Sequence, residues 1–576
     1  MKIIQQREVP ALAQAALPDH LHPVLRRVYA ARRISSADEL DNGLSRLLPP
    51  LALKDMTAAV DLLDRALQDG QRILIVGDFD ADGATSSALM VSGLRAMGAG
   101  RVEFLVPNRF EFGYGLTPEI VAVAARAAPD LLITVDNGIS SIDGVAAAKA
   151  LGMRVLVTDH HLPGAELPLA DAIVNPNQPG DQFPSKCLAG VGVAFYLLMA
   201  LRGRLRETGW FQVRRLAEPN LAEYLDLVAL GTVADLVPLD RNNRVLLQQG
   251  IQRVRAGRCR PGILALLEAA GRAPGRLVAA DFGFGVGPRL NAAGRLDDMS
   301  LGIECLLCED AAHARELAGR LDALNRERRE IEADMNSSAL KHVQNMRPDT
   351  GELPLGLCLY DAGWHQGVIG ILASRIRERF HRPAIAFADA GDGQLKGSAR
   401  SIPGLHIRDT LAAIAARHPG LLNKFGGHAM AAGLSLSARR LAAFRDAFED
   451  ELAARLDVGA LQGVVESDGE LAADDFSLEL SELLRSAGPW GQGFPEPLFD
   501  GEFIVLSQRV VGERHLKLTV RCAAGERVLD AIAFRQAGGQ RLREGQRVRL
   551  AYRLDTNEYR GLLGLQLIVE LIQPVD

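Results

Sequence analysis

The chain has 576 residues, of which 48% are hydrophobic, and its formal net charge at pH 7 is −6. This length predicts several packed domains, and the negative charge argues against a protein that coats nucleic acid, although a local basic groove stays compatible with it. The sequence has no uncharged run long enough to span a bilayer, no signal-peptide core at its start and only six scattered cysteines, so we expect a soluble cytoplasmic protein without a membrane partner.

Short apolar runs alternate with helical patterns after an N-terminal segment, residues 1–60. Apolar strands that alternate with helices are typical of a parallel sheet covered on both faces, and in such sheets the ligand lies at the carboxyl ends of the strands. We therefore predict an α/β domain over residues 61–310. Its strands are the runs ILIVG, VEFLV, LLITV, RVLVT and AIV, which occupy residues 73–77, 102–106, 131–135, 154–158 and 172–174.

Three aspartates, Asp78, Asp80 and Asp82, follow the first of these strands at alternate positions. Three like charges this close repel one another unless a cation lies among them. Further ionisable residues follow the later strands and an apolar helix, namely Asp136, Asp159, His160, His161 and Asp235. A single aspartate after a strand is most often a turn residue or a helix N-cap, so the prediction of a metal site depends on these motifs together.

This donor set is rich in carboxylates, contains histidine and lacks cysteine. Such a set suits Mn²⁺ or Mg²⁺ better than structural zinc. About six ligands are enough for two cations roughly 3.5–4 Å apart, which can activate a water and stabilise both the attacking and the leaving oxygen at phosphorus. The sequence therefore predicts a site for two Mn²⁺ or Mg²⁺ ions.

The rest of the chain shows three further patterns. Residues 313–343 are heavily charged with apolar residues at helical spacing, which predicts a long connecting helix within 311–350. A second α/β domain is predicted over 351–457, and β-type runs separated by turns predict a small barrel over 458–576, plausibly an oligonucleotide-binding (OB) fold. Cys305 and Cys308 form one CxxC within an apolar stretch, which favours core packing over a metal or redox site.

The motifs DFDAD, VDN, DHH and GTVAD, in this order, resemble the four motifs of the DHH phosphoesterases. The stretches GPRLNAAGR, WHQGVIGILASR, GSARS, FGGHAMAAG and GPWGQGFPEPLF narrow the resemblance to the RecJ family of exonucleases specific for single-stranded DNA. The match spans nearly the whole chain. It implies a DHH catalytic domain, a DHHA1 substrate-binding domain and an OB-like domain. It also implies 5′→3′ degradation of single-stranded DNA to 5′-mononucleotides, dependent on Mn²⁺ or Mg²⁺, in recombination and repair.

The resemblance also implies roles for individual residues. Asp80 and Asp82 match the paired aspartates of the first motif, and Asp136 matches the carboxylate that bridges both metals. His160 and Asp235 match further ligands, and His161 would be a catalytic residue or lie just outside the ligands. Many DHH relatives carry a histidine where this chain has Val76, and Asp78 is a candidate for the missing ligand.

A phosphodiester substrate needs positive charge outside the metal pair. A lone arginine is usually a solvated surface charge, but several lie within the matching motifs. Arg289, predicted to be catalytic, and Arg295 are expected in a glycine-rich loop that approaches phosphates. The other predicted substrate-binding residues are Arg109, Ser398, Arg400, Gly426, Gly427 and His428. The strand path would be a cleft between the two α/β domains, and Arg109, Ser398 and Arg400 would read a 5′-phosphate.

The C-terminal region offers residues that could stack on or contact a strand, although some of them will be core: Phe494, Phe499, Tyr552, Tyr559 and Lys517. A barrel of this kind argues against the alternative of a DHH hydrolase of short oligonucleotides or nucleotide phosphates, since a small substrate needs no strand-binding platform. A non-catalytic scaffold is disfavoured because all the motif carboxylates are present. The resemblance also implies a single-stranded-DNA-binding protein and a RecQ-type helicase as partners.

Overall fold

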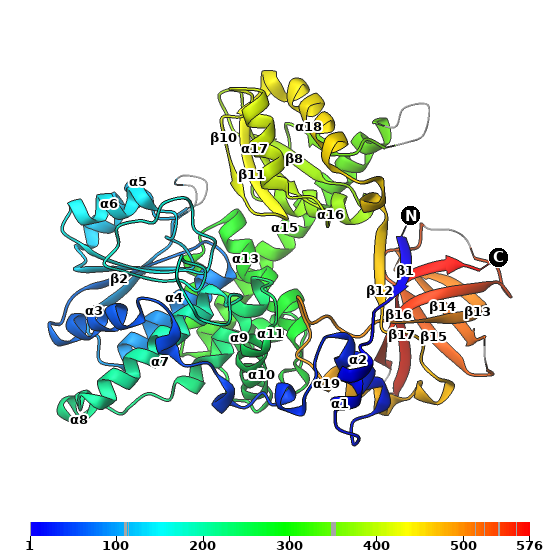
Figure 1. Ribbon diagram of the computed structural model, residues 1–576, viewed down its shortest axis with the longest axis horizontal. Helices are drawn as coiled ribbons and strands as arrows, with labels where there is room; N and C mark the ends of the chain where they lie inside the picture. Colours follow the sequence, from blue (N-terminus) through cyan, green and yellow to red (C-terminus); the bar gives the residue numbers. More distant parts are fainter. Residues whose placement is uncertain are drawn as a thin grey trace. The chain divides into compact units, whose positions relative to one another are not determined.

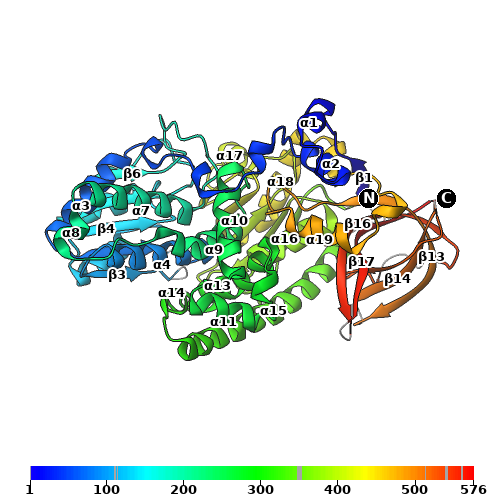
Figure 2. The same ribbon diagram turned by 90° about the horizontal axis from the view of Figure 1, so that it is seen from below.

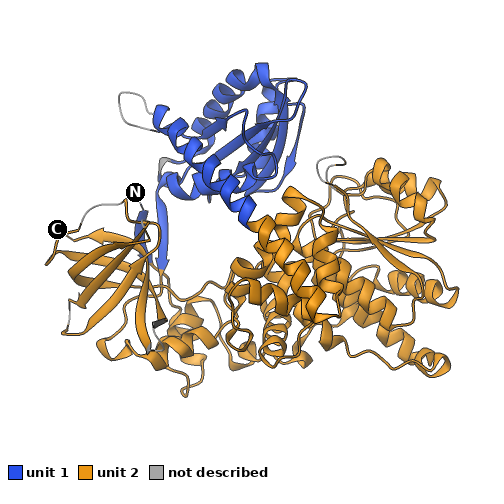
Figure 3. Ribbon diagram, turned by 180° about the vertical axis from the view of Figure 1, so that it is seen from behind, with its two compact units in different colours: residues 1–5, 326–466 blue, residues 6–325, 467–576 orange. Residues whose placement is uncertain are grey.

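The computed structural model describes residues 2–108, 112, 115–346, 353–512, 514–523, 525–538, 542–559 and 562–575. The chain forms two compact units, which are coloured separately in Figure 3. The smaller unit holds residues 1–5 and 326–466, and the larger unit holds residues 6–325 and 467–576. The metal motifs and the C-terminal region therefore belong to the same unit.

The larger unit contains a five-stranded parallel sheet in the order β3-β2-β4-β5-β6. Its strand β2 is labelled in Figure 1. Its strands are β2 (Ile73–Gly77), β3 (Val102–Leu105), β4 (Leu131–Val135), β5 (Arg154–Thr158) and β6 (Ala172–Val174). Successive side chains point to opposite faces, so Ile75 packs in the core of α3 (Met56–Gln68), α4 (Ala81–Ala96) and α7 (Gly190–Glu207). Val76 packs on the other face with α5 (Pro118–Ala124) and α6 (Ile142–Ala150). The predicted α/β fold is confirmed, and the ends of β2, β4 and β5 are neighbours.

A helical layer follows the sheet. It comprises α8 (Trp210–Arg214), α9 (Leu225–Ala234), α10 (Arg241–Arg255), α11 (Pro261–Ala269), α12 (Ala279–Asp281), a π-helical turn (Phe282–Val286), α13 (Gly287–Leu296) and α14 (Ser300–Leu307). The predicted long helix is confirmed as α15 (Ala311–Asn345). Cys305 is buried in the core, as its apolar surroundings predicted. In the described ranges no helix is both long and apolar enough to cross a membrane.

The glycine-rich stretch around Arg289 and Arg295 is a helix, α13, and not the predicted loop. Pro288 occupies its first turn, where the missing backbone N–H costs nothing and the fixed φ favours a helix. Gly294 serves close packing, since a Cβ at this position would lie 1.8 Å from the carbonyl oxygen of Phe79. The glycines of this motif thus bring α13 against the segment that carries the aspartate triplet.

The N-terminal segment packs against the region that precedes the barrel. Its helices are α1 (Ala11–Ala16) and α2 (Pro23–Ala31). The Tyr29 ring lies 6.0 Å from that of Trp490 and 6.5 Å from that of Phe494, measured between centroids. Arg32 donates two hydrogen bonds to the buried Asp468, at 2.8 and 3.0 Å. A paired, bidentate buried arginine of this kind fixes orientation, so the segment ties the C-terminal region to the rest of the larger unit.

The smaller unit is a second α/β layer structure, as predicted. Its sheet has the order β10-β11-β9-β8-β7, in which only β7 and β8 are parallel. The strands are β7 (Leu357–Tyr360), β8 (Ala384–Asp389), β9 (Gln394–Arg400), β10 (Lys424–Gly427) and β11 (Ala431–Ser437). The helices are α16 (Ile369–Phe380), α17 (Ile407–Arg417) and α18 (Leu441–Arg455). A short two-stranded sheet joins β1 (Lys2–Gln6) to β12 (Gly463–Ser467).

The C-terminal region forms a closed barrel in the order β13-β14-β15-β17-β16, preceded by α19 (Leu478–Ser486) (Figure 2). Its strands are β13 (Phe499–Val511), β14 (His515–Cys522), β15 (Val528–Ala533), β16 (Arg547–Tyr559) and β17 (Leu562–Pro574). This closure is the strand order of an OB fold, which confirms the predicted barrel.

Three of the aromatic residues considered for base stacking lie in the core instead. Phe494, Phe499 and Tyr552 are each no more than 3% exposed. Tyr552 contacts Phe503 inside the barrel, because alternate residues of a strand face inward. The side chain of Tyr559 lies outside the described residues. Lys517 is partly exposed and forms an ion pair of 2.9 Å with Asp530.

Candidate metal centre

The predicted metal ligands converge at one edge of the parallel sheet. Asp78 follows β2, Asp136 follows β4, and His160 follows β5 after one intervening residue, while Asp235 is the C-cap of α9. Since β2, β4 and β5 are adjacent and parallel, their carboxyl ends bring these side chains together. The three aspartates after β2 lie in the segment that starts α4, so they face the same edge.

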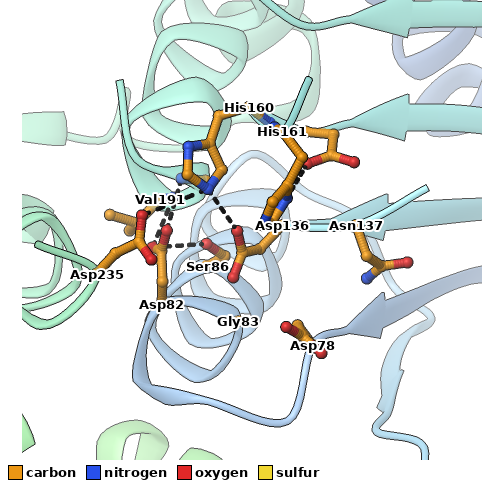
Figure 4. A network of polar contacts seen from close by, with 12 residues as sticks. Asp78, Asp82, Gly83, Ser86, Asp136, Asn137, His160, His161, Val191 and Asp235 are labelled. Carbon is orange, nitrogen blue, oxygen red and sulfur yellow. Dashed lines mark hydrogen bonds and ion pairs between the residues drawn. The ribbon is translucent and has the colours of Figure 1, made fainter. Parts of the chain in front are cut away.

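Three overlapping groups of side chains could each hold a metal ion (Figure 4). Within each group, one potential ligand atom per residue lies within 4.8 Å of the others. His160 links two of them, because its Nε2 lies 3.1 Å from Oδ1 of Asp136 and 3.4 Å from Oδ2 of Asp235. The groups are Asp78–Asp80–Asp136, Asp136–His160–His161 and Asp82–His160–Asp235. All six predicted ligands and His161 are therefore brought together.

Backbone amides at two helix starts hold two aspartates of the triplet, Asp80 and Asp82. Asp82 accepts hydrogen bonds from the N–H groups of Gly190, at 2.6 Å, and Val191, at 2.9 Å, in the first turn of α7. Asp80 is the N-cap of α4 and accepts from the amides of Asp82 and Gly83 at 3.0 and 3.1 Å. The positive ends of both helix dipoles favour these negative charges.

Two glycines make room for the carboxylates. A Cβ at Gly190 would lie 2.7 Å from Oδ1 of Asp136, and one at Gly231 would lie 2.8 Å from Oδ1 of Asp82. Asp136 itself has a φ of 61°, in the left-handed region that non-glycine residues rarely adopt. Such backbone strain persists where the surrounding structure holds it, and it clusters at functional sites.

Asn137 joins the two strands that carry most of the carboxylates. Its side-chain amide donates to the carbonyl oxygens of Val76, at 3.1 Å, and Val135, at 2.9 Å, near the ends of β2 and β4. Asn137 is 1% exposed, so these bonds are made in a low-dielectric interior. We infer that Asn137 sets the separation between the aspartate triplet and Asp136.

Asp159 positions the histidine pair, a role that the sequence alone did not assign. Its carboxylate accepts hydrogen bonds from the backbone N–H groups of His160 and His161, at 2.7 and 3.0 Å. It also lies 2.7 Å from Nδ1 of His161. Burial would lower the pKa of His161, but the bond to Asp159 raises it to about 9. A signal was present in the sequence, because Asp159 is the first residue of the DHH motif.

The cluster carries more negative charge than burial tolerates. Burial raises the pKa of Asp82 to about 7, with the neighbouring Asp80 as the next cause. Burial and the repulsion of neighbouring aspartates also raise the pKa values of Asp136 and Asp235 well above the ordinary range. Two of the three groups combine carboxylate oxygens with one or two imidazoles, the third consists of carboxylates alone, and none contains a thiolate. Such donor sets fit Mn²⁺ or Mg²⁺.

The predicted substrate residues of the larger unit are placed differently. Arg109 lies outside the described residues. Arg289 is 7% exposed and donates to the carbonyl oxygens of Gly285 and Ala269, and it pairs with Asp322 at 2.8 Å. These contacts are those of an arginine that packs helices together, so they favour a structural role over the predicted catalytic one. Arg295 is half-buried in the last turn of α13.

The predicted residues of the smaller unit share one sheet face. Arg400 donates to the Ser398 hydroxyl at 3.1 Å and to that of Ser374 in α16 at 3.2 Å. Ser398 of β9 lies opposite Gly433 of the neighbouring strand β11. Gly433 lies in turn opposite Gly426 of β10. A Cβ at Gly426 or Gly433 would meet nothing, so the glycines leave the backbone open beside Ser398.

The hairpin between β10 and β11 carries the other two predicted residues. Gly427 has a φ of 138°, and a Cβ there would lie 2.4 Å from the carbonyl oxygen of Ala431, so only glycine fits. His428 is exposed at the tip of the hairpin, and its backbone N–H donates to Ala431 at 2.8 Å. Both residues therefore lie next to the open glycine surface.

Comparison with known proteins matches three family models to the chain. They are the DHH family N-terminal domain over residues 72–232, the DHHA1 domain over 355–454 and the RecJ OB domain over 467–571. The chain is 58% identical over the full length of both proteins to the single-stranded-DNA-specific exonuclease RecJ of Dickeya dadantii. It is 56% identical to that of Escherichia coli K12, with 99% of each chain covered.

Solved structures match as well. RecJ from Thermus thermophilus in complex with Mn²⁺ has a TM-score of 0.80 and 32% identity, over 98% of this chain and 78% of that one. RecJ of the same organism in complex with Mg²⁺ has a TM-score of 0.74 and 30% identity, over 98% of this chain and 76% of that one.

Replacing Asp136 with alanine should remove metal binding and abolish hydrolysis while the fold stays intact. Asp136 belongs to two of the three candidate groups, and its removal relieves repulsion among buried carboxylates. Mn²⁺ titration by calorimetry, with circular dichroism and thermal unfolding, checks this. Glu103→Ala, which removes an exposed carboxylate from β3, is the matched control. Near-normal hydrolysis by the Asp136 variant would contradict the assignment.

Mn²⁺ affinity should rise with pH between about pH 6 and pH 8. Without metal, the raised pKa of Asp82, about 7, keeps that carboxyl protonated below neutrality, and the cation must displace the proton. Each proton released contributes about a ten-fold change in apparent affinity per pH unit. Calorimetry in two buffers of different ionisation enthalpy measures the number of protons released. An affinity that is flat over this range would show that the carboxylates are already ionised.

Proposed function

The chain belongs to the RecJ family and is a single-stranded-DNA-specific exonuclease, and we propose that it degrades the strand from its 5′ end and releases 5′-mononucleotides. The observation that carries this proposal is the convergence of five carboxylates and His160 at one sheet edge, next to the histidine held by Asp159. The closed barrel in the same unit supports a long strand as the substrate. We place this activity in DNA recombination and repair, in the cytoplasm.

The carboxylates and His160 would hold two Mn²⁺ or Mg²⁺ ions. When bound, such ions polarise a phosphoryl oxygen and lower the pKa of a water, which makes it a nucleophile near neutral pH. The protein contributes a fixed geometry. Asp82 is held by two backbone amides. Asp136 is held in a strained backbone conformation next to Asn137, whose side chain is hydrogen-bonded to the ends of β2 and β4. The ligands therefore need little reorganisation when the substrate binds.

His161 is the proposed proton donor. Release of a 5′-mononucleotide breaks the bond between phosphorus and the 3′-oxygen of the terminal nucleotide, and that oxygen leaves with negative charge. The bond to Asp159 raises the pKa of His161 to about 9, which favours the protonated imidazole. Asp159 fixes the Nδ1 side of the ring, so the proposed donor is the N–H at Nε2. A positioned acid of this kind typically contributes about 10²–10⁴-fold to the rate.

Recognition of the 5′ end is assigned to Ser398 and Arg400 of the smaller unit, while Arg109, predicted to share this role, lies outside the described residues. A terminal phosphate monoester carries up to one more negative charge than an internal diester, and charge-assisted hydrogen bonds read this difference. Arg400 is oriented by two serine hydroxyls, and its guanidinium lies 2.9 Å from the position of a Cβ at Gly370, near the start of α16. Cleavage leaves a new 5′-phosphate on the shortened strand, so the same contacts apply after every cut.

The outer face of β14 and β15 is the proposed strand-binding surface of the barrel. In β14 the buried Leu516, Leu518 and Val520 alternate with outward residues, which are His515, Lys517, Thr519 and Arg521. Phe534, just after β15, is 50% exposed and lies edge-on to His515 at 5.1 Å between centroids. The second and third strands of an OB fold commonly bind nucleic acid, by basic groups that follow the backbone and aromatic rings that stack on bases.

We also propose two protein partners, a single-stranded-DNA-binding protein and a RecQ-type helicase. An enzyme that acts on single strands needs a partner that unwinds duplexes and one that keeps the product single-stranded. Family membership supports this proposal. The alternative substrates, short oligonucleotides or nucleotide phosphates, would leave the barrel surface without a role.

Arg400→Ala should lower activity on 5′-phosphorylated strands far more than on 5′-hydroxyl strands. A lost charge-assisted bond costs about 1.5–3 kcal/mol, or roughly 10–150-fold, where the terminal phosphate is present. Initial rates on the two substrates, each labelled at either end, measure both the preference and the direction. Arg408→Ala, an exposed arginine of α17, is the control. Equal losses of activity on both substrates would contradict the assignment of a pocket for the 5′-phosphate. Release of the 3′ label before the 5′ label would contradict degradation from the 5′ end.

Lys517→Ala combined with Phe534→Ala should weaken binding to long strands and reduce its dependence on salt. The two changes remove a phosphate contact and a stacking ring, and each stacked base is worth about 1–3 kcal/mol. Fluorescence anisotropy with strands of increasing length checks this, and Arg543→Ala, an exposed basic residue elsewhere on the barrel, is the control. Removal of the chain from about residue 460 onward is a poorer test, because it also removes Trp490 and Asp468, which hold the N-terminal segment. Unchanged affinity for long strands would show that they bind at a surface other than the outer face of β14 and β15.

A further inference from the structure

Two large apolar side chains of the larger unit are exposed, and one of them follows a metal-centre residue in the sequence. Leu236, which directly follows Asp235, is 69% exposed, and Phe284 is 75% exposed. Both are held by unusual backbone: Leu236 has a φ of 60°, in the left-handed region, and Phe284 lies in the π-helical turn. Positive φ at a bulky residue and π-turns both concentrate at functional sites. Neither the metal centre nor the barrel surface explains why these two side chains face solvent.

Both side chains line the same cavity, which has a volume of 240 Å³. Its walls come from the end of α9, from α10, from α12 and the π-helical turn, and from the end of α19 with the segment that follows it. The π-helical turn packs on α9, since a Cβ at Gly283 would lie 3.2 Å from a methyl group of Val233. The lining is mostly apolar, but it includes Thr232, whose buried hydroxyl has no hydrogen-bond partner in the described part of the chain. The cavity therefore offers an apolar surface with an unused polar group.

The rim of this cavity is positively charged. Arg255 and Arg485 both line it. Burial lowers the pKa of Arg255, and repulsion by Arg485 lowers it further, so the two charges are close enough to interact. Glu482 pairs with Arg485 at 3.0 Å, and Glu496, which also lines the cavity, pairs with Arg553 at 2.7 Å. An apolar floor with an arginine rim matches a flat ring that is joined to phosphates.

We propose that this cavity binds one nucleobase of the strand being degraded, within the first four nucleotides of the cleaved end. The base would stack on Phe284 and contact Leu236, while Arg255 and Arg485 face the adjacent phosphates. The argument for a base near the cleaved end is the position of Leu236, which lines the cavity and directly follows the metal-centre residue Asp235. The inference rests on the proposed action on single-stranded DNA. Stacking is insensitive to base identity, so every register of the strand would fit.

An abasic scan tests this site without relying on hydrolysis. Strands that each carry one abasic position, moved in single steps from the 5′ end, are bound to the full-length protein in EDTA and followed by anisotropy. The wild type should bind roughly ten-fold more weakly when the missing base falls at one particular position within the first four. Phe284→Ala should bind every strand of the series equally, because the ring that discriminates is gone. Val213→Ala, an exposed apolar residue of α8, is the control and should keep the wild-type pattern.

Three outcomes overturn the proposal. One is a flat scan in the wild type, which would indicate another occupant, such as an apolar side chain of a partner protein. Another is a positional minimum that persists unchanged in Phe284→Ala, which would place the base elsewhere. A third is a minimum beyond the fourth nucleotide. Failure of the proposed function would look different, because the protein would then fail to bind or hydrolyse intact strands in Mn²⁺ at all.

Discussion

Repulsion among buried carboxylates is the constraint on which this structure depends. Burial and like charges raise the pKa values of Asp82, Asp136 and Asp235. A carboxyl whose pKa is raised on folding stabilises the fold at low pH and loses that contribution as pH rises through the folded value, here about 7 for Asp82. The metal-free fold is therefore least favoured in the pH range where the carboxylates can bind cations. Divalent cations reverse this balance, because they bind only the deprotonated folded site.

Rigid parts of the fold, which are strand ends, a buried side-chain amide and the first turn of a helix, hold these charged groups close to one another. The ends of the strands fix the backbone positions of the ligands. The Asn137 side chain donates hydrogen bonds to the ends of both β2 and β4 and so links them. The first turn of α7 donates two amides to Asp82, and Gly190 lets that turn approach Asp136 closely. The site is thus built from backbone geometry across more than a hundred residues of sequence. Substitution of such a glycine would displace a ligand without touching any ionisable group.

The sequence predicted the elements whose signals are local. Continuous apolar runs predicted β2, β4 and β5 at the residues where they occur, whereas the glycines around Arg289 suggested a loop and in fact serve helix packing. The polar residues that follow those strands could be grouped from the sequence alone, since parallel strand ends meet at one edge. Features that depend on tertiary packing could not be predicted from the sequence. Only the register of the barrel strands decides that the Tyr552 side chain faces inward. The exposure of Leu236 and Phe284 follows from one residue in the left-handed backbone region and one π-helical turn, and neither has a sequence signature in this chain.

Stepwise degradation asks for two kinds of contact with opposite properties. Stacking and phosphate contacts, such as those proposed for the barrel face and for Phe284, are nearly equal in every register, so they hold the strand without fixing its position. A contact to the terminal phosphate exists in one register only. If it contributes about 1.5–3 kcal/mol, it favours that register by roughly 10–150-fold over its neighbours. Because each cut creates a new terminal phosphate one nucleotide further on, the same difference in free energy then favours a shift of one nucleotide. On this proposal, direction arises from the contact with the terminal phosphate, and continued binding to the strand arises from contacts that are nearly equal in every register.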